Sequence, residues 1–171
     1  MTSPPPSPVA HAIFLSWCSA DAKDKDDLIA RLTPNLANLT GLDLSWWEMS
    51  QLRPGEEFEP SILARLVECD SGLQLVSPGW AASTFIRTHE TPVFVGPGAS
   101  RMALPVGLRR VPMGAGSMDL QGIDKLQLHL YQGKFYSELR GANRDAFAQS
   151  LALRIRERIL GVSPWRRITR P

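Results

Sequence analysis

Glu90 is an acidic side chain at the end of a short predicted helix, where a carboxylate could do chemistry on a bound ligand. Ser83, Ile86 and Glu90 share one face of a predicted helix, because steps of four and seven residues return close to the same azimuth. This helix follows a predicted strand directly, so its face can point into the crevice at the strand's end. A carboxylate fixed there can stabilise positive charge on a substrate. The alternative without a functional role is a solvent-exposed helix end, with Glu90 paired to Arg87.

Aromatic and hydroxyl side chains follow the ends of other predicted strands. The indole faces of Trp17 and Trp46 can stack on flat or cationic rings, although both residues can equally belong to the core. The hydroxyls of Ser19 and Ser77 can bond ribose or phosphate, although turn chemistry explains both as well. These residues are therefore candidates for ligand contact rather than assigned ones.

Strand-like and helix-like segments alternate along most of the chain and must position these side chains. Strands are predicted at residues 12–17, 42–47, 72–76 and 104–108, with a fifth, half-exposed strand at 126–130. Helices are predicted around the apolar positions Leu28, Leu32 and Leu36; Phe58, Ile62, Leu66 and Cys69; and Phe147, Leu151, Ile155 and Ile159, with a short one over 82–90. The alternation predicts an α/β fold with an open parallel sheet covered by helices on both faces.

Prolines mark the expected irregularities. Pro34 should kink or shorten its helix, Pro60 suits a first helical position, and the 82–90 helix should stop before Pro92. Pro105 is awkward inside a strand. Residues 49–57, which contain Pro54 and Gly55, are predicted to form a loop.

Composition sets the broad class. We expect a proline-rich disordered leader at 1–10, one domain at 11–162 and a loose basic tail at 163–171. The net charge of +2, from 19 basic and 17 acidic residues, gives no basis for binding nucleic acid. The chain has no apolar run that approaches a membrane span and no signal-peptide pattern, so we predict a cytoplasmic protein that binds no membrane. Cys18 and Cys69 are expected to be free thiols.

Several familiar α/β sites lack their residues here. The turn after the first strand, Trp17–Asp21, contains no glycine, which argues against a dehydrogenase-type dinucleotide site. A P-loop and an esterase Gly-x-Ser-x-Gly turn are absent from the sequence, and the third strand ends without a phosphoacceptor aspartate. The three histidines lack metal-ligand spacing, so we predict no metal site.

Five segments, in order and at the predicted strand ends, resemble Toll/interleukin-1-receptor (TIR) domains. The opening strand reads Phe-Leu-Ser-Trp-Cys-Ser-Ala-Asp, the second strand and its BB loop read Leu-Ser-Trp-Trp-Glu-Met-Ser-Gln-Leu-Arg-Pro-Gly, and Gly-Glu-Glu-Phe enters the next helix. Leu-Val-Ser-Pro-Gly-Trp-Ala-Ala-Ser is similar to the family's third strand and its turn. Thr84–Pro92, Thr-Phe-Ile-Arg-Thr-His-Glu-Thr-Pro, resembles bacterial members that carry Glu-Leu-Pro. Phe85 lies five residues before Glu90, which is the bacterial spacing.

The resemblance implies a flavodoxin-like fold with five parallel strands and the bacterial activity of NAD glycohydrolase or cyclase, with Glu90 catalytic. It implies NAD⁺ as substrate, no separate cofactor, and a role in immune or anti-phage signalling. Contacts to the substrate are predicted for the residues at the strand ends and on the Glu90 helix: Trp17, Ser19, Trp46, Ser77, Ser83 and Ile86. Self-association through the BB-loop residues Leu52, Arg53, Pro54 and Gly55 would complete a neighbour's pocket.

The chemistry is consistent with one essential carboxylate. Breaking the bond between nicotinamide and ribose develops oxocarbenium character on the sugar, which a fixed carboxylate stabilises. The cationic nicotinamide ring already leaves readily, so a second carboxyl acid is not required. Two alternatives stay open from sequence: a TIR interaction module without catalysis, and an enzyme of related fold that processes free nucleosides.

Overall fold

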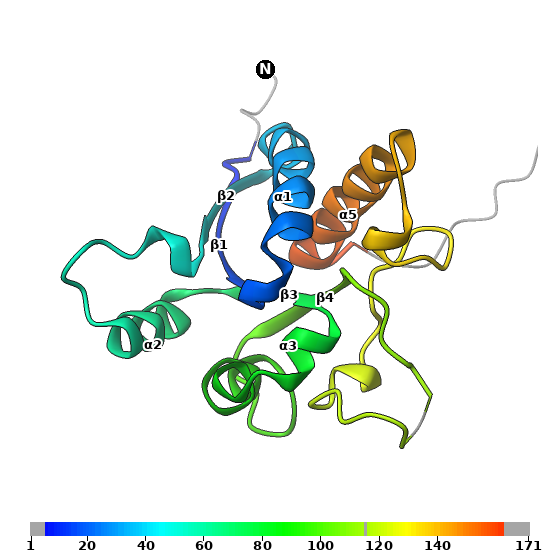
Figure 1. The fold of residues 1–171 in the computed structure, drawn as a ribbon. Helices are drawn as coiled ribbons and strands as arrows, with labels where there is room; N and C mark the ends of the chain where they lie inside the picture. The colour runs from blue at the N-terminus through cyan, green and yellow to red at the C-terminus, as the bar shows by residue number, and fades with distance from the viewer. Residues whose placement is uncertain (1–5, 115, 163–171) are drawn as a thin grey trace, which may run out of the picture.

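Four parallel strands form the central sheet of the fold. The structure is a computed structural model that describes residues 6–114 and 116–162. The strands are β1 (Val9–Ser16), β2 (Leu42–Trp47), β3 (Ser71–Val76) and β4 (Met102–Gly107), in the order β2-β1-β3-β4. Every residue of β3 is buried, as expected for a strand covered on both faces. The predicted α/β class with a parallel sheet is confirmed (Figure 1).

The prediction of a fifth strand at 126–130 is wrong. This segment makes one parallel bridge, between His129 and Val106, with N···O distances of 2.9 Å from His129 to Pro105 and from Gly107 to His129. The next bond of a ladder toward the start of the segment would need an N–H at Pro105, and proline has none. On the other side the chain reverses within Tyr131–Lys134. The pairing therefore ends after one residue, and β4 is the edge strand.

Two long helices cover one face of the sheet. α1 (Ala22–Ala37) and α5 (Ala142–Leu160) lie side by side (Figure 1) and share one buried cluster with the strands. The stripes predicted from sequence are confirmed: the α1 leucines at 28, 32 and 36 and the α5 residues Phe147, Leu151 and Ile155 are buried. α1 continues three residues past Pro34, which corrects the expected shortening. Pro34 and Ala30 are both exposed. Water can therefore solvate the carbonyl of Ala30, which has no N–H donor at Pro34.

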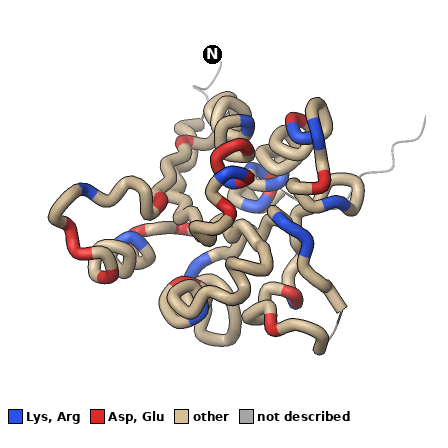
Figure 2. The backbone as a smooth tube through the Cα atoms, viewed as in Figure 1, with Lys and Arg blue, Asp and Glu red and all other residues tan. Residues whose placement is uncertain are grey.

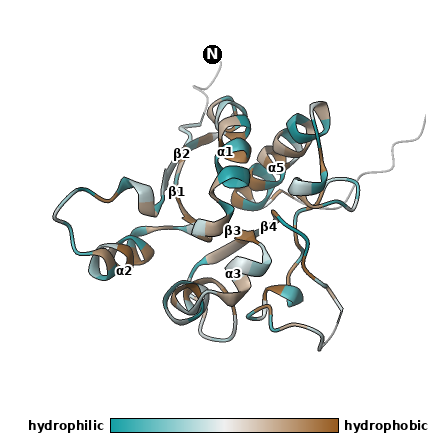
Figure 3. Cartoon of the chain, viewed as in Figure 1, coloured by the Kyte–Doolittle hydropathy of each residue, from teal (hydrophilic) through white to brown (hydrophobic). Residues whose placement is uncertain are grey.

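Shorter helices cover the other face: α2 (Phe58–Glu68), α3 (Pro78–Ala82) and α4 (Thr91–Phe94). Phe14 of β1 packs there with Ile62 and Leu66 of α2 and with Phe94 of α4. Phe58, predicted to be buried, is 48% exposed. It is the first residue of α2, and its ring lies beside that of Phe85, with the two centroids 5.4 Å apart. Figure 3 shows hydrophobic and hydrophilic residues alternating around the helices.

The segment predicted as one helix over 82–90 has a different form. α3 ends at Ala82, a π-helical turn, η3, spans Ile86–Glu90, and α4 begins at Thr91. Pro92 does not stop the helix, because it occupies the first turn of α4, where a missing N–H costs little. Short 3-10 turns lie at Ser19–Asp21, Met49–Gln51, Ile123–Lys125 and Tyr136–Glu138.

The two ends differ in how far they are described. β1 begins at Val9, three residues before the strand start predicted at Ala12 and inside the range predicted for the leader. Residues 1–5 of that leader and the predicted basic tail at 163–171 lie outside the described residues. Across residues 6–114 and 116–162, no helix combines the length and the apolar content that a membrane span requires.

Candidate functional site

The Glu90 side chain reaches the carboxyl end of β1. Its carboxylate accepts a hydrogen bond from the hydroxyl of Ser16, the last residue of that strand. The indole Nε1 of Trp80, on α3, donates to the same Ser16 oxygen at 3.0 Å. Ser16, Trp80 and Glu90 are all buried, and Glu90 is 7% exposed. The three side chains form a polar chain inside an apolar layer.

Burial controls the protonation of Glu90. Removal from water penalises the carboxylate form and raises the pKa of Glu90 from its usual 4.5 to about 7, while the Ser16 hydrogen bond opposes part of that rise. Close to neutral pH this carboxyl group is therefore divided between its acid and carboxylate forms. A poised carboxyl of this kind is what proton transfer and charge stabilisation at a site require.

The π-helical turn η3 fixes the direction of Glu90. The amide of Thr91 bonds to the carbonyl of Ile86, five residues earlier, so the helix is wider here than an α-helix. Pro92 supplies a physical reason, because its ring crowds the carbonyl four residues before it and it has no N–H to offer. Single π turns of this type recur at functional sites. On the outer side of η3, the rings of Phe85 and His89 are tilted to each other with centroids 4.7 Å apart, and His89 Nε2 lies 3.4 Å from the carboxylate of Glu59 on α2.

Ser77 and Asp21 hold the start of α3. The Ser77 hydroxyl accepts from the amide of Trp80 at 2.9 Å as the N-cap and donates to the carboxylate of Asp21. Both residues are buried. The predicted contact of Ser77 with substrate is thus matched by a complete structural role, namely orienting the helix that carries Trp80.

Two other predicted substrate contacts, Ser83 and Ile86, lie in the segment just before Glu90. Ile86, 3% exposed, belongs to the apolar cluster that contains Trp80. The Ser83 hydroxyl accepts from the amide of Ile86 at 3.3 Å and caps the turn. Ile86 therefore contributes to the apolar surroundings that desolvate Glu90, while Ser83 is half-buried and keeps some access to solvent.

Trp17 and Ser19 do not join Glu90. Trp17 packs with the cluster under α1 and α5, on the other face of the sheet from Ser16. Its ring face is occupied by the ammonium group of Lys25, 4.1 Å from the centroid, and Lys25 is also paired with Glu48 at 2.9 Å. A ligand ring would have to displace that cation to stack there. Ser19 is exposed in the 3-10 turn that follows β1.

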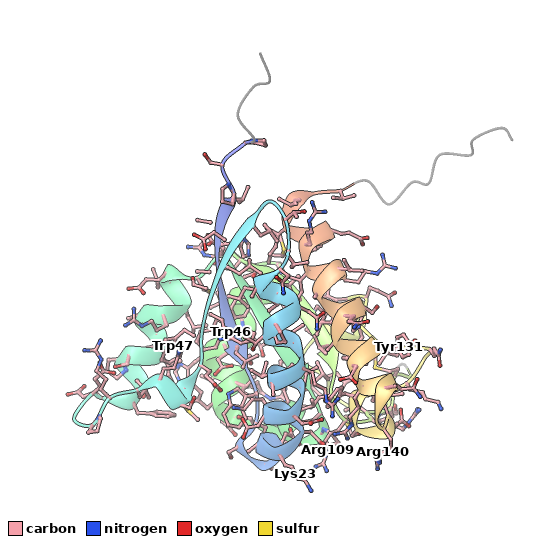
Figure 4. All side chains as sticks on the ribbon, turned by 90° about the horizontal axis from the view of Figure 1, so that it is seen from above. Lys23, Trp46, Trp47, Arg109, Tyr131 and Arg140 are labelled. Carbon is pink, nitrogen blue, oxygen red and sulfur yellow. The ribbon has the colours of Figure 1, made fainter. Side chains whose placement is uncertain are left out.

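Trp46 and the loop that joins β2 to α2 line a hollow away from Glu90. A hollow of about 500 Å³ is lined by the ends of β2, the loop and α2, including Trp46, Trp47, Leu52 and Arg53. Figure 4 shows Trp46 and Trp47 together near the end of β2. Glu90 does not line this hollow. The predicted loop is confirmed over the stretch between β2 and α2, and it extends away from the sheet (Figure 1).

A tight turn forms the tip of that loop. The amide of Glu56 bonds to the carbonyl of Arg53 at 3.1 Å, and Gly55 has a φ of +90°. With Pro54 second and a left-handed glycine third, this geometry matches a type II turn. Arg53, Pro54 and Gly55 are exposed and Leu52 is half-buried, so the tip is free for contact in an isolated chain.

Two members of the site, Ser16 and Trp80, were not predicted from sequence. Ser16 gave one signal: it is a polar residue inside the apolar run 12–17, and a buried hydroxyl must find a hydrogen-bond partner.

Among the described residues, no three His, Cys, Asp or Glu side chains lie close enough to hold a metal ion. Comparisons of the chain with protein-family models and with curated proteins gave no match.

Proposed function

We propose that this chain is a TIR-type NAD⁺ glycohydrolase or cyclase in which Glu90 is the catalytic carboxylate. The observation that carries the proposal is a buried, poised carboxyl group held at the carboxyl end of β1, where ligands bind in open parallel sheets. The order β2-β1-β3-β4 supports it, because it matches the first four positions of the flavodoxin-like order 2-1-3-4-5.

In the proposed reaction, the bond between the ribose C1′ and the nicotinamide nitrogen breaks, and its electron pair neutralises the pyridinium ring. The ionised Glu90 carboxylate stabilises the positive charge on the sugar. A water oxygen then bonds to C1′ and loses its proton, which gives ADP-ribose; attack by an adenine nitrogen gives a cyclic product instead. Ser16 holds the carboxylate in place through its hydroxyl.

Access to Glu90 depends on movement or on a neighbouring subunit. The side chain is 7% exposed and lines neither of the two hollows described for this chain. We propose that packing between copies through Leu52–Gly55 opens and completes the pocket, consistent with the exposed loop tip. In a cell, such a domain would act in immune or anti-phage signalling when assembly is triggered.

The same burial favours a second candidate, a TIR interaction module without catalysis. In that case Glu90 is a structural acid that ties η3 to β1, and the projecting loop is the functional feature.

The two candidates differ in NAD⁺ consumption. Concentrated wild-type protein is incubated with NAD⁺ and free nicotinamide is measured over a dilution series. The enzyme releases nicotinamide at a rate per molecule that falls on dilution, whereas the scaffold releases none at any concentration.

A further inference from the structure

A second hollow, of about 470 Å³, lies where α1 and α5 begin and is rich in positive charge. Its lining includes five basic residues and two acidic ones: Lys23, Arg31, Arg109, Arg140 and Arg144 with Asp21 and Asp24. Figure 4 shows Lys23, Arg109 and Arg140 gathered at one end of the two helices, and Figure 2 shows basic and acidic residues close together there. Ser16, Trp80 and Glu90 do not line it, whereas Asp21, which accepts the hydrogen bond from Ser77 at the start of α3, does.

Carboxylates already partner three of the five cations. Arg31 pairs with Asp27 and Asp145, and Arg144 pairs with Asp27 at 2.7 Å and Asp24 at 3.6 Å. Arg109 is shared, with Asp24 at 3.1 Å and Asp21 at 3.4 Å, while its side chain is 50% exposed. These pairs fix the walls of the hollow and orient Arg109 toward it.

The remaining two cations have no carboxylate partner in the described part of the chain. Lys23 is exposed, and no acidic oxygen lies within ion-pair distance of its ammonium group there. Arg140 donates from Nη1 to the carbonyls of Ser137 and Leu139, both at 2.7 Å, which leaves Nε and Nη2 free. A guanidinium fixed by carbonyls and aimed at a basic hollow suits the fork-like recognition of phosphate oxygens.

We infer that this hollow binds a phosphate-bearing small molecule, held by Lys23, Arg140 and Arg109. Its volume lies in the range of pockets for small ligands. The first residues of α1 and α5 contribute to the lining, and the positive ends of the two helix dipoles add to the attraction for an anion. The inference is independent of NAD⁺ cleavage at Glu90.

Calorimetric titration with pyrophosphate at constant ionic strength tests the inference. Wild-type protein should give a saturable isotherm, and the variant Lys23→Ala/Arg140→Ala should bind about tenfold more weakly or worse, because two charge-assisted contacts are lost. The control Lys125→Ala/Lys134→Ala removes the same charge from exposed residues outside the hollow and should bind like the wild type. Lys23→Glu is a second test, since Lys23 supports no carbonyl and the fold is expected to tolerate it.

Parallel titrations with inorganic phosphate and with ADP separate the sources of the phosphate. Tighter binding of ADP than of pyrophosphate indicates a nucleotide, and equal binding indicates recognition of the phosphate groups alone. Absence of saturable binding by all three probes overturns the inference. Equal loss in the hollow and control variants also overturns it, because it shows unspecific attraction to net charge.

Discussion

The Ser16 hydroxyl donates a hydrogen bond to the Glu90 carboxylate across 74 residues of sequence, from the last residue of β1 to the last residue of η3. This bond joins the sheet to η3, the one π-helical turn among the described residues. It also supplies the buried carboxylate with a donor that favours its ionised form. The behaviour of Glu90 should therefore be measurable in both stability and catalysis.

Stability should fall as pH rises through the range in which Glu90 ionises. The folded pKa of about 7 lies above the usual 4.5, so between these values the folded chain holds a proton that the unfolded chain has lost. Raising the pH from 4.5 to beyond 7 should cost the wild type up to about 3 kcal/mol, and the loss is constant above that range. Denaturant unfolding at several pH values measures it. Glu90→Gln should lack this contribution, and an unchanged pH slope in that variant would argue against a shifted Glu90.

Nicotinamide release by the wild type should increase with pH through a midpoint close to 7. The proposed chemistry uses the ionised carboxylate, and the pKa of Glu90 is about 7. Initial rates at saturating and at low NAD⁺, across pH 5 to pH 9, give the profile (about two units either side of the midpoint). A rate that is flat across this range would show that the ionisation of Glu90 does not limit the reaction.

Ser16→Ala should move that midpoint upward and lower the rate at neutral pH. The substitution removes the hydroxyl that opposes the rise in the pKa of Glu90 and leaves the Trp80 Nε1 without its acceptor. It should also lower the free energy of unfolding by about 1–2 kcal/mol. Ser45→Ala, at an exposed position of β2, is the matched control. Loss of activity at an unchanged midpoint would indicate a merely structural role for Ser16.

Gly55→Ala should weaken self-association while the core stays intact. Gly55 has a φ of +90°, and a side chain there strains the turn by about 1 kcal/mol although it meets no neighbour. Gly98→Ala is the control, because its added Cβ is equally free of contacts and its backbone is not in the left-handed region. Sedimentation over a concentration series compares the two. If both variants associate like the wild type, the loop tip does not determine assembly.

Much of the fold could be predicted because local pattern decided it. The continuous apolar runs became the parallel strands, and the leucine stripe of α1 and the four-residue steps of α5 became buried helix faces. Three of the errors came from proline. Pro34 was expected to kink or shorten its helix and Pro92 to stop one, yet α1 continues to Ala37 and Pro92 lies in the first turn of α4. Pro105 ended the pairing of the fifth segment through a missing donor, which depends on which way its backbone nitrogen points.

The candidate site was less predictable, because its parts come from distant segments. Helical spacing placed Ser83, Ile86 and Glu90 near one another, but it could not indicate that Glu90 would be buried against Ser16. Trp17 was expected near a ligand, and instead its ring faces Lys25 on the opposite side of the sheet. Adjacent residues of a strand point to opposite faces, so Ser16 rather than Trp17 reaches Glu90.

The most direct test of the account is nicotinamide release from NAD⁺ by concentrated Glu90→Gln protein beside wild type and a control, Glu157→Gln, which changes an acid on α5 whose side chain is 43% exposed. Thermal unfolding at pH 5 first establishes that all three proteins are folded. The account predicts that Glu90→Gln loses at least about a hundredfold in rate, while Glu157→Gln retains wild-type release. Wild-type release from folded Glu90→Gln protein, or no release from the wild type itself at any concentration, would contradict it.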